Sequence, residues 1–423
     1  MGVTLFVYWV YAASPVTTSS DSKFVLYSAA SFLTNGDWNL NEFSSVMLPV
    51  DDYKLLRIDG DVYSYFSLGP SLVSIPFLVA FDALLNPRET LSAYLLENPH
   101  DLLEWKIASA VVALAAGAVF LFSKELLGPR LAAIVPALVF AFGTSAWSTA
   151  SRAMWQHGPS MLMISTALFL LLRARSTPAL AVLAGPVLAF GYVIRPTNGI
   201  ALMLLTIPVF LRYREYFIHY VFGVVAVFIP FAYLNLQVYG GLLPPYFDID
   251  RLATGPHFFE ALWANLISPS RGLFVYSPIL LMALYGLYIK LARKELDSLD
   301  YAIAAVVVVH WVVISSYPHW WAGHSYGPRF FCDVIPCFIY FLAPVTSQWR
   351  LPRWSLSSVS KHSALVVLMG FSIFVHGRGA MDWSTTLWNP TPVGVDQAPQ
   401  RVWDWRDPQF LRTEDGSLLD LVL

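Results

Sequence analysis

One carboxylate in this chain stands at a position where charge is costly. Asp21 follows directly on the first apolar run, Val3–Val16, and opens a long acidic segment. Hydrocarbon makes ionised side chains expensive, so an acid at the water edge of a membrane helix is a functional-site hypothesis by default. The alternative is an ordinary solvated acid in a loop. If Asp21 is functional, its chemistry is the removal of a proton from a hydroxyl or an amine.

Cationic residues lie at other segment ends that we assign to the same face as Asp21. Three of them are arginines, whose position opposes the usual preference of basic residues for the cytoplasmic side. Guanidinium groups bind phosphate bidentately. A carboxylate facing such groups suits sugar transfer from a phosphate-activated donor, because the acid deprotonates the acceptor and the cations offset the charge of the departing phosphate. The residues expected to bind the donor are Lys23, His157, Arg195, Arg271, His324 and Arg329.

Each of these features also has a plainer interpretation. Arg195 can extend to the outer headgroups, and Trp320 and Trp321 can be interfacial anchors. The segment Asp59-Gly60-Asp61 can be a solvated turn, although its two acids are also candidates to support Asp21. His319 and His324 are five residues apart, but no motif supports a metal site, so we expect none.

The composition defines the class of protein. Of the 423 residues, 57% are hydrophobic and only 13% are charged, which indicates a chain that crosses a membrane many times. There is no basic tail or block, so a nucleic-acid partner is not expected. Cys332 and Cys337 lie in an apolar run at a spacing that suits neither a metal nor a redox pair, and buried packing is the expected role.

Charge predicts the topology. Twelve apolar runs can be recognised, and the short basic connections between them fall on one side only if one of the first two runs does not cross. The run Leu68–Leu85 is the better candidate, because it contains Gly69, Pro70, Pro76 and Asp82. We therefore predict an all-α membrane protein with about eleven transmembrane helices, a cytoplasmic N-terminus and an outer C-terminus.

The same topology predicts the domain organisation. Residues 1–378 form a transmembrane domain whose first outer loop, residues 17–102, carries interfacial helices, and residues 379–423 form a short extracytoplasmic tail. The inner connections hold nearly half of the 26 basic residues and few of the 28 acids. The other face is large, acidic and irregular, so we expect any chemistry there.

At this point the residues resemble the GT-C superfamily of membrane glycosyltransferases, which includes protein mannosyltransferases and the bacterial aminoarabinose transferases of lipid A; the likeness is greatest to bacterial members. The resemblance covers most of the chain as spaced short motifs. It implies interfacial helices between the first two spans, a polyprenyl-phosphate sugar as donor, and a catalytic base at Asp21. The matching segments are Asp21-Ser22-Lys23, Asp59 to Ser64, Gly69-Pro70, Gln156 to Pro159, Arg195 to Asn198, Ser268 to Pro278, Trp321 to Arg329 and Trp403 to Pro408.

The chain departs from the family pattern in two respects. Many relatives have two adjacent acids after the first span, whereas Asp21 is followed by Ser22 and Lys23. Lys23 then helps to bind phosphate, or the second acid comes from Asp59 or Asp61. The large outer domain of some relatives is also missing, and a tail of this size is too short for much independent core.

The sequence therefore predicts an inverting glycosyltransferase of the cell (inner) membrane, acting on the extracytoplasmic face without a resident cofactor. Its partners are membrane lipid, a lipid-linked sugar donor, and a glycan, lipid or protein acceptor. A lipid-linked sugar flippase and a non-catalytic membrane subunit remain the alternatives.

Overall fold

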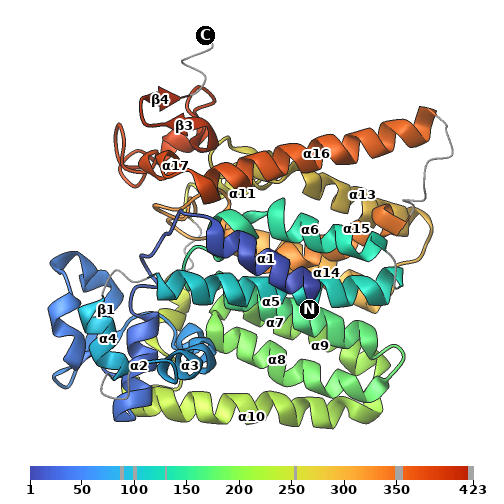
Figure 1. The fold of residues 1–423 in the computed structure, drawn as a ribbon. Helices are drawn as coiled ribbons and strands as arrows, with labels where there is room; N and C mark the ends of the chain where they lie inside the picture. Colours follow the sequence, from blue (N-terminus) through green and yellow to red (C-terminus); the bar gives the residue numbers. More distant parts are fainter. Residues whose placement is uncertain (86–89, 99–101, 129–130, 252–254, 348–355, 418–423) are drawn as a thin grey trace.

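The computed structural model describes residues 1–85, 90–98, 102–128, 131–251, 255–347 and 356–417. Most of these residues are helical, and the long helices run side by side as a bundle with smaller lobes at one end (Figure 1). The predicted basic connections at Arg130, Arg350 and Arg353 lie outside the described residues.

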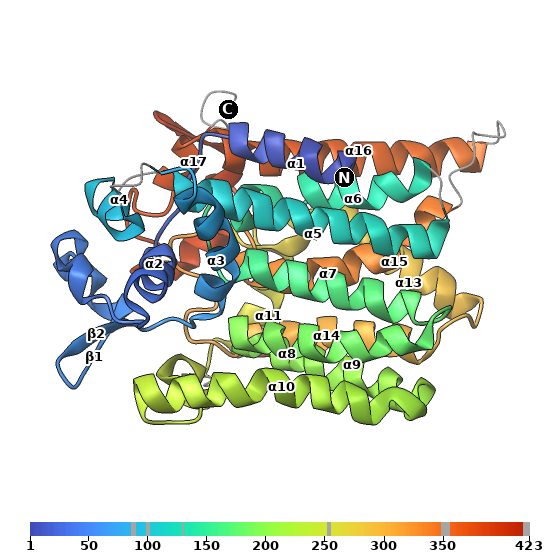
Figure 2. The ribbon, with the colours of Figure 1, turned by 60° about the horizontal axis from the view of Figure 1, so that its bottom comes forward.

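The bundle is built from helices that are apolar along most of their length. In both ribbon views α10 and α16 lie on opposite sides of it, with the other helices between them (Figure 1, Figure 2). The bundle helices are α1 (Gly2–Ala13), α5 (Leu103–Leu127), α6 (Ile134–Phe142), α7 (His157–Arg173), α8 (Ala181–Ile194), α9 (Gly199–Arg212), α10 (Arg214–Tyr239), α13 (Leu281–Ala292), α14 (Ser298–Ser315), α15 (Ile335–Ser347) and α16 (Leu356–Met381).

Within the described residues, five helical segments are long and apolar enough to cross a membrane, and several shorter apolar helices accompany them. The chain is thus a membrane protein, whereas the number of eleven spans stays a prediction. The five segments are Leu103–Leu127, Arg214–Tyr239, Ser298–Ser315, Arg329–Ser347 and Ser363–Met381.

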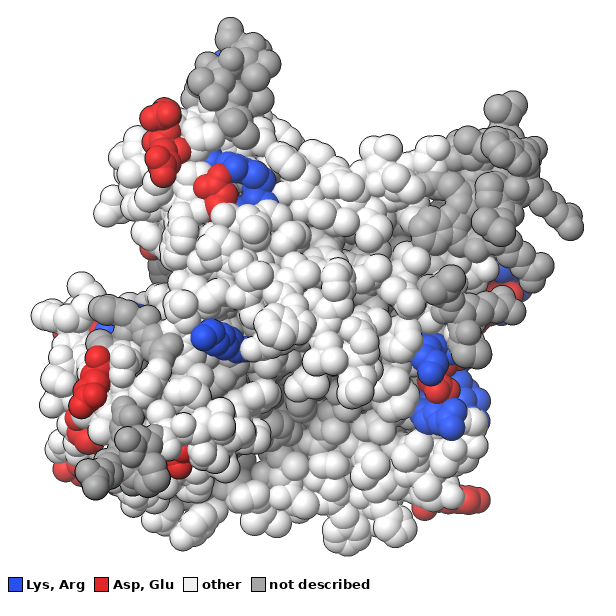
Figure 3. Space-filling view, viewed as in Figure 1, with Lys and Arg blue, Asp and Glu red and all other residues white. Residues whose placement is uncertain are grey.

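Packing within the bundle distinguishes inner from lipid-facing helices. α5 packs closely on α7 and buries small residues that include Ala108, Ala115 and Ala116. α10 is just as apolar but exposes Phe222, Ile229 and other large side chains. Such a surface is favourable in lipid and unfavourable in water. The middle of the bundle in Figure 3 is accordingly almost free of charged side chains.

One end of the bundle carries the described basic connections, and we call it the basic end. The helices α5, α7, α9 and α13 finish there, and α14 begins there. Asp297 caps α14 by accepting hydrogen bonds from the backbone N–H groups of Leu299 and Asp300. Its other oxygen pairs with Arg175 at 2.7 Å and with Arg212 at 3.8 Å.

The opposite end, which we call the cavity end, carries the N-terminal lobe (Figure 1). In this lobe α3 packs mainly on α2 and also touches α8, and the interfacial placement of Leu68–Leu85 stays a prediction. The lobe contains α2 (Val25–Asn35), β1 (Leu55–Ile58), β2 (Asp61–Ser64), α3 (Gly69–Asp82) and α4 (Leu91–Glu97), with β1 and β2 paired as a hairpin.

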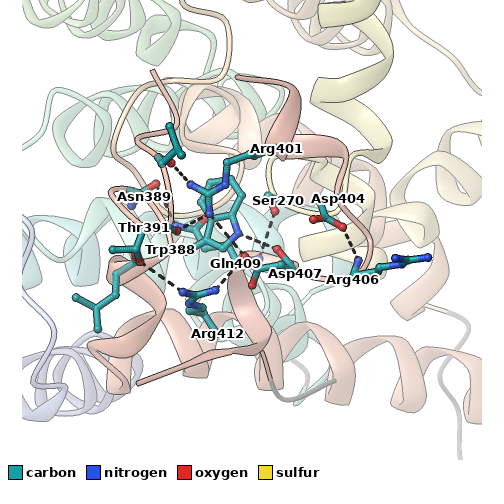
Figure 4. A network of polar contacts seen from close by, with 12 residues as sticks. Ser270, Trp388, Asn389, Thr391, Arg401, Asp404, Arg406, Asp407, Gln409 and Arg412 are labelled. Carbon is teal, nitrogen blue, oxygen red and sulfur yellow. Dashed lines mark hydrogen bonds and ion pairs between the residues drawn. The ribbon is translucent and has the colours of Figure 1, made fainter. Parts of the chain in front are cut away.

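A C-terminal segment, residues 382–417, lies beside this lobe and contains α17 (Ser384–Leu387), β3 (Arg412–Thr413) and β4 (Gly416–Ser417). It follows α16 and packs against the connection between α11 (Phe258–Ile267) and α12 (Leu273–Tyr276). Figure 4 shows its polar core, where Arg401 lies over the Trp388 ring and Arg412 pairs with Asp407 at 3.1 Å. The segment is thus folded onto the bundle.

Candidate active site

A cavity of about 1630 Å³ opens at the cavity end. Its walls come from the N-terminal lobe, from the ends of α8, α9, α10 and α14, and from the connection before α15. Residues within 20–70, 154–157, 192–203, 246–249 and 313–330, together with 228 and 396, contribute, so segments far apart in the sequence meet here. The charged and imidazole residues of its wall are Asp21, Lys54, His157, Arg195, Asp248, His319, His324, Arg329 and Asp396.

Asp21 reaches the cavity because the chain after α1 is clamped. The fully buried Arg152 donates from Nη1 to the carbonyl of Ser14 at 2.9 Å and from Nη2 to that of Tyr11 at 2.8 Å. The backbone N–H of Thr18 in turn donates to the Arg152 carbonyl at 3.3 Å. Burial lowers the pKa of Arg152 to about 9. The turn that carries Asp21 is therefore fixed against the bundle.

The Asp21 carboxylate is 30% exposed and has two neighbours. Its Oδ2 lies 3.3 Å from Nη1 of Arg329, and its Oδ1 accepts a hydrogen bond from the Tyr53 hydroxyl at 3.4 Å. Both contacts are long for a charge-assisted bond. The acid is thus held at the cavity wall and remains accessible.

Arg329 is positioned by the strained turn that precedes it. Gly327 has φ +58°, and a Cβ there would lie 2.5 Å from the Tyr276 ring, so only glycine fits. The guanidinium lies 4.5 Å above the Trp155 ring and 5.4 Å from that of Phe330. Its Nε is buried and has no partner among the described residues. Arg329 therefore keeps hydrogen-bonding capacity next to Asp21.

Arg195 lies deeper in the same wall, where α8 ends. The lobe meets the bundle at this point, because Gly69 packs so closely on α8 that a Cβ would lie 2.4 Å from the Cα of Ile194. Arg195 pairs through Nε with Asp333 Oδ2 at 3.0 Å, and His157 Nδ1 lies 2.9 Å from Asp333 Oδ1. All three side chains are buried, but only Arg195 and His157 line the cavity.

Lys54 and Lys23 are held by one acid, Asp51. Lys54 approaches Asp51 at 2.8 Å, and Lys23 pairs with the other carboxylate oxygen. Burial raises the pKa of Asp51, but hydrogen bonds from Lys23, Lys54 and the backbone N–H of Leu48 outweigh it and lower the pKa to about 2. Both lysines are therefore paired with the same carboxylate, and Lys54 lines the cavity.

His324 lies at the outer rim of the cavity with Asp396 from the C-terminal segment. Their closest atoms are 3.5 Å apart and both side chains are half exposed. The Trp321 indole N–H donates to Asp396 at 2.8 Å, which fixes the acid there. Within the described part of the chain, no group of three or more histidine, cysteine or carboxylate side chains is arranged to hold a metal.

The structure thus brings five of the predicted site residues to one cavity: Asp21, His157, Arg195, His324 and Arg329. Lys23 lies outside its wall, tied to Asp51. Asp59 is exposed in the turn of the β1–β2 hairpin, and Asp61 accepts from the Asn41 amide at 2.7 Å. Neither acid lines the cavity, so a supporting role there remains an untested prediction.

Arg271 is also away from the cavity and is fully used elsewhere. It donates to the carbonyls of Ser270, Trp321 and Gly323, and to the side chains of Asn389 and Gln409, at 2.7 to 3.1 Å. Burial lowers its pKa to about 10. Arg271 therefore ties the C-terminal segment to the loop that carries His324 and Arg329.

Sequence reasoning did not select Asp333, Asp51, Tyr53, Gln156 or Asp396 as site residues. Asp333 had a recognisable signal, since it is an acid within an apolar run. Gln156 has its carbonyl occupied by the Tyr246 hydroxyl at 3.0 Å, whereas its buried Nε2 has no partner among the described residues. Asp51, Tyr53 and Asp396 belong to polar loops and carried no such signal.

Comparison with known proteins gives one informative likeness. No protein-family model matches the sequence, and no curated protein matches it. The chain is similar to the crystal structure of the Archaeoglobus fulgidus oligosaccharyltransferase in complex with zinc and sulfate, with a TM-score of 0.53 and 12% identity. The match covers 96% of this chain and 57% of that one.

The likeness shows a shared fold. The chain spans little more than half the length of the oligosaccharyltransferase, and at 12% identity the match carries the fold alone. The prediction of a mostly helical fold of this kind is supported, whereas membership of the GT-C superfamily stays a prediction. The bacterial branch and the particular type of transferase stay predictions.

Proposed function

We propose that this chain is an inverting glycosyltransferase that moves a sugar from a polyprenyl-phosphate donor to an acceptor. The reaction takes place at the cavity end of the bundle, on the extracytoplasmic face of the cell (inner) membrane. Asp21 is the catalytic base, and Arg195 and Arg329 bind the donor phosphate. The coarse part of this proposal is supported by the fold shared with an oligosaccharyltransferase.

The observation that carries the proposal is the pairing of Asp21 with Arg329 in the wall of a large cavity that also contains Arg195. A carboxylate beside cations with free donors combines a proton acceptor with an anion-binding group. Arg329 Nε and Gln156 Nε2 are buried donors without a partner among the described residues. Leaving them unpaired costs free energy, which an oxygen-rich ligand would recover.

The geometry suggests an order of events. A phosphate bound to Arg329 competes with Asp21 for Nη1 and releases Oδ2 to the acceptor. Asp21 then takes the proton of the acceptor hydroxyl or amine as its oxygen or nitrogen bonds to the anomeric carbon. The bond from that carbon to the phosphate oxygen breaks on the opposite face, which inverts the configuration. The electron pair leaves with the polyprenyl phosphate, whose charge Arg195 and Arg329 offset.

The charges in the wall favour a donor with one phosphate. Lys54 shares Asp51 with Lys23, Arg195 is paired with Asp333, and Arg329 is paired with Asp21. Few net positive charges remain for a ligand, which suits a phosphodiester with a single charge better than a diphosphate. Apolar cavity residues on and around α8, α9 and α10 suit the adjoining isoprenoid: Tyr192, Leu202, Met203, Phe228, Phe247 and Ile249.

The sidedness follows from the positive-inside rule. The basic end carries Arg173, Arg175, Arg212 and Lys290 at or near its short connections, which supports a cytoplasmic location for it. The cavity end then faces outward. Its exposed rim near His324 and Asp396 leaves access for a glycan, lipid or protein acceptor from that side.

The test is mass spectrometry of extracted lipids and glycans from four strains: wild type, a strain without the protein, Asp21→Asn, and Asp297→Asn. Asp297 is a matched control, because it is an acid paired with arginines at the basic end. The proposal expects a prenyl-phosphate sugar to accumulate, and one glycan to lose that sugar, in the null and Asp21→Asn strains only.

Other outcomes would redirect the assignment. A glycan lost in the null strain but kept in Asp21→Asn at normal protein level would refute Asp21 as base and favour a non-catalytic subunit. A lipid-linked sugar that changes leaflet without covalent transfer would favour a flippase.

A further inference from the structure

Three buried side chains behind the cavity form a closed polar ring. His157 Nδ1 lies 2.9 Å from Oδ1 of Asp333, and Arg195 Nε lies 3.0 Å from Oδ2 of the same carboxylate. Arg195 Nη1 completes the ring at 3.3 Å from His157 Nε2, with Nδ1 at 3.5 Å. Thr197 supports it by accepting from Arg195 Nε at 2.9 Å. Asp333 itself is fully buried.

The ring determines where the imidazole proton lies. A guanidinium has only donors, and an ionised carboxylate has only acceptors. His157 Nδ1 must therefore carry the hydrogen that Asp333 accepts. Arg195 Nη1 lies 3.3 Å from Nε2 and 3.5 Å from Nδ1, so the guanidinium packs against the imidazole. A second proton would place a positive charge against that guanidinium, so the arrangement favours the neutral imidazole protonated at Nδ1.

We infer that Asp333 is a positioning residue for Arg195, and that His157 is a neutral bridge in this ring rather than a phosphate ligand or a proton donor. This inference rests on the proposed function and deepens it. With Nε held by Asp333 and Thr197 and Nη1 by His157, Arg195 keeps Nη2 for the cavity. No described residue accepts a hydrogen bond from Nη2.

The ring matters because arginine is a flexible side chain. A free arginine side chain has rotamer entropy, and a ligand that binds it must overcome the loss of that entropy. A guanidinium fixed before the ligand arrives needs no rearrangement when negative charge develops on the phosphate. A purely structural ion pair would have no reason to expose one partner, whereas here Arg195 lines the cavity and Asp333 does not.

The charges around His157 come from several elements. Asp333 and Arg195 contact it directly, and Arg329 lies in the same wall. His310 on α14 lies nearby and contacts the carbonyl of Phe330 at 2.8 Å. Two cations and one buried acid therefore face the ring, and His157 is expected to stay neutral across the range in which free histidine titrates.

The first experiment observes the imidazole directly. Full-length protein labelled with nitrogen-15 in histidine is studied by NMR between about pH 5 and pH 8, and the His157→Asn variant identifies the His157 signals. We expect one protonated and one unprotonated ring nitrogen, with Nδ1 protonated, at every pH. A signal that titrates, or a proton on Nε2, would overturn the inference. This measurement needs neither substrate nor an Asp333 variant.

The second experiment measures binding of farnesyl phosphate, as a phosphate probe, to the wild type, Asp333→Asn and Asp300→Asn. Asp300 is a matched control, because it is a buried acid paired with Lys290 at the basic end. Asp333→Asn should weaken binding of farnesyl phosphate about tenfold to a hundredfold, because an Arg195 side chain that is no longer held in place loses its charge-assisted contact with the phosphate. Asp300→Asn should bind like the wild type. Equal affinity in all three proteins would reduce Asp333 to a structural role.

Variants of His157 distinguish a bridging role of this side chain from a role in acid–base catalysis. In His157→Asn the amide can still donate to Asp333, and in His157→Gln it can still accept from Arg195. Both should raise the donor KM and leave the shape of the kcat/KM pH profile unchanged. Loss of one limb of that profile would show that His157 exchanges a proton, against the inference. If the wild type binds no farnesyl phosphate, the proposed donor fails, whereas the NMR result still decides the ring.

Discussion

The two ends of the bundle use the same residue types differently. At the basic end, Arg173 lies 3.4 Å from Glu125 and Arg175 lies 2.7 Å from Asp297, and these side chains are a quarter to a half exposed. At the cavity end, the side chains of Arg195 and Arg329 are only 7% and 11% exposed, in the wall of a cavity. Water solvates the first set, whereas the second set depends on the protein and on what enters the cavity.

This difference separates a topological role from a chemical one. Exposed ion pairs contribute little free energy, and the positive-inside rule gives the arginines of the basic end a topological role in the proposed orientation. A buried arginine with unpaired donors has a cost that only a partner can offset. The unpaired Nε of Arg329 beside the accessible Asp21 is therefore the reason to propose chemistry at the cavity end.

The largest expected difference between the ends concerns their acids. Asp21→Asn should lower the rate of sugar transfer by about 10²- to 10⁴-fold, the usual contribution of a general base, with little change in the amount of folded protein. Asp297→Asn, at the basic end, should stay within about twofold of the wild type, since surface substitutions rarely act at a distance. Transfer rates of both purified variants in detergent or nanodiscs measure the contrast. Comparable losses in both would remove the distinction.

The arginines should differ in the same direction but by less. Arg329→Gln removes a charge-assisted contact to the donor phosphate, which is worth about 1.5–3 kcal/mol, so the donor KM should rise about tenfold to a hundredfold. Arg175→Gln removes a similar ion pair at the basic end and should leave the donor KM unchanged. Steady-state kinetics with the donor varied at fixed acceptor give both values. A larger effect at Arg175 would contradict the assignment of the ends.

The sequence was informative where membrane physics restricts charge. Asp21, Arg195 and Arg329 were selected because ionised groups at the ends of apolar runs have a cost, and the structure places all three in one cavity wall. Asp333 follows the same rule, but the sequence analysis did not single it out. The side on which basic connections fall predicts that Leu68–Leu85 does not cross the membrane, and in the structure α3 packs mainly on α2.

The sequence did not predict the partners of polar residues in loops, because several partners are sterically possible there. Lys23 is two residues from Asp21, yet it pairs with Asp51, 28 residues away, because the lobe folds back on itself. Arg271 resembled the other outer arginines, but carbonyl and amide oxygens from the C-terminal segment and the Trp321–Gly323 loop occupy its donors. Tertiary contacts of this kind produce no periodicity in the sequence, so they cannot be predicted from it.

A smaller effect concerns acid stability and is confined to the N-terminal lobe. The pKa of Asp51 in the folded protein is about 2, below its ordinary value of 3.8, so its ion pairs stabilise the lobe above about pH 4. That contribution is lost as the pH falls from about 4 to about 2. Hydrogen exchange of peptides from β1 and β2 should therefore accelerate in this range. Asp51→Asn should exchange faster already at neutral pH and lose that dependence.

The smallest expected effect is on stability and concerns an ion pair at the basic end. Glu125→Gln breaks the ion pair with Arg173, whose guanidinium is about half exposed, so the free energy of unfolding should change by less than about 1 kcal/mol. Transfer activity should not change. Thermal unfolding in detergent at low and high salt measures the difference in stability between the wild type and Glu125→Gln. High salt should reduce that small difference further. A loss of several kcal/mol, or a defect in transfer, would mean that ion pairs at the basic end are coupled to the cavity, and that the two ends do not divide topology from chemistry.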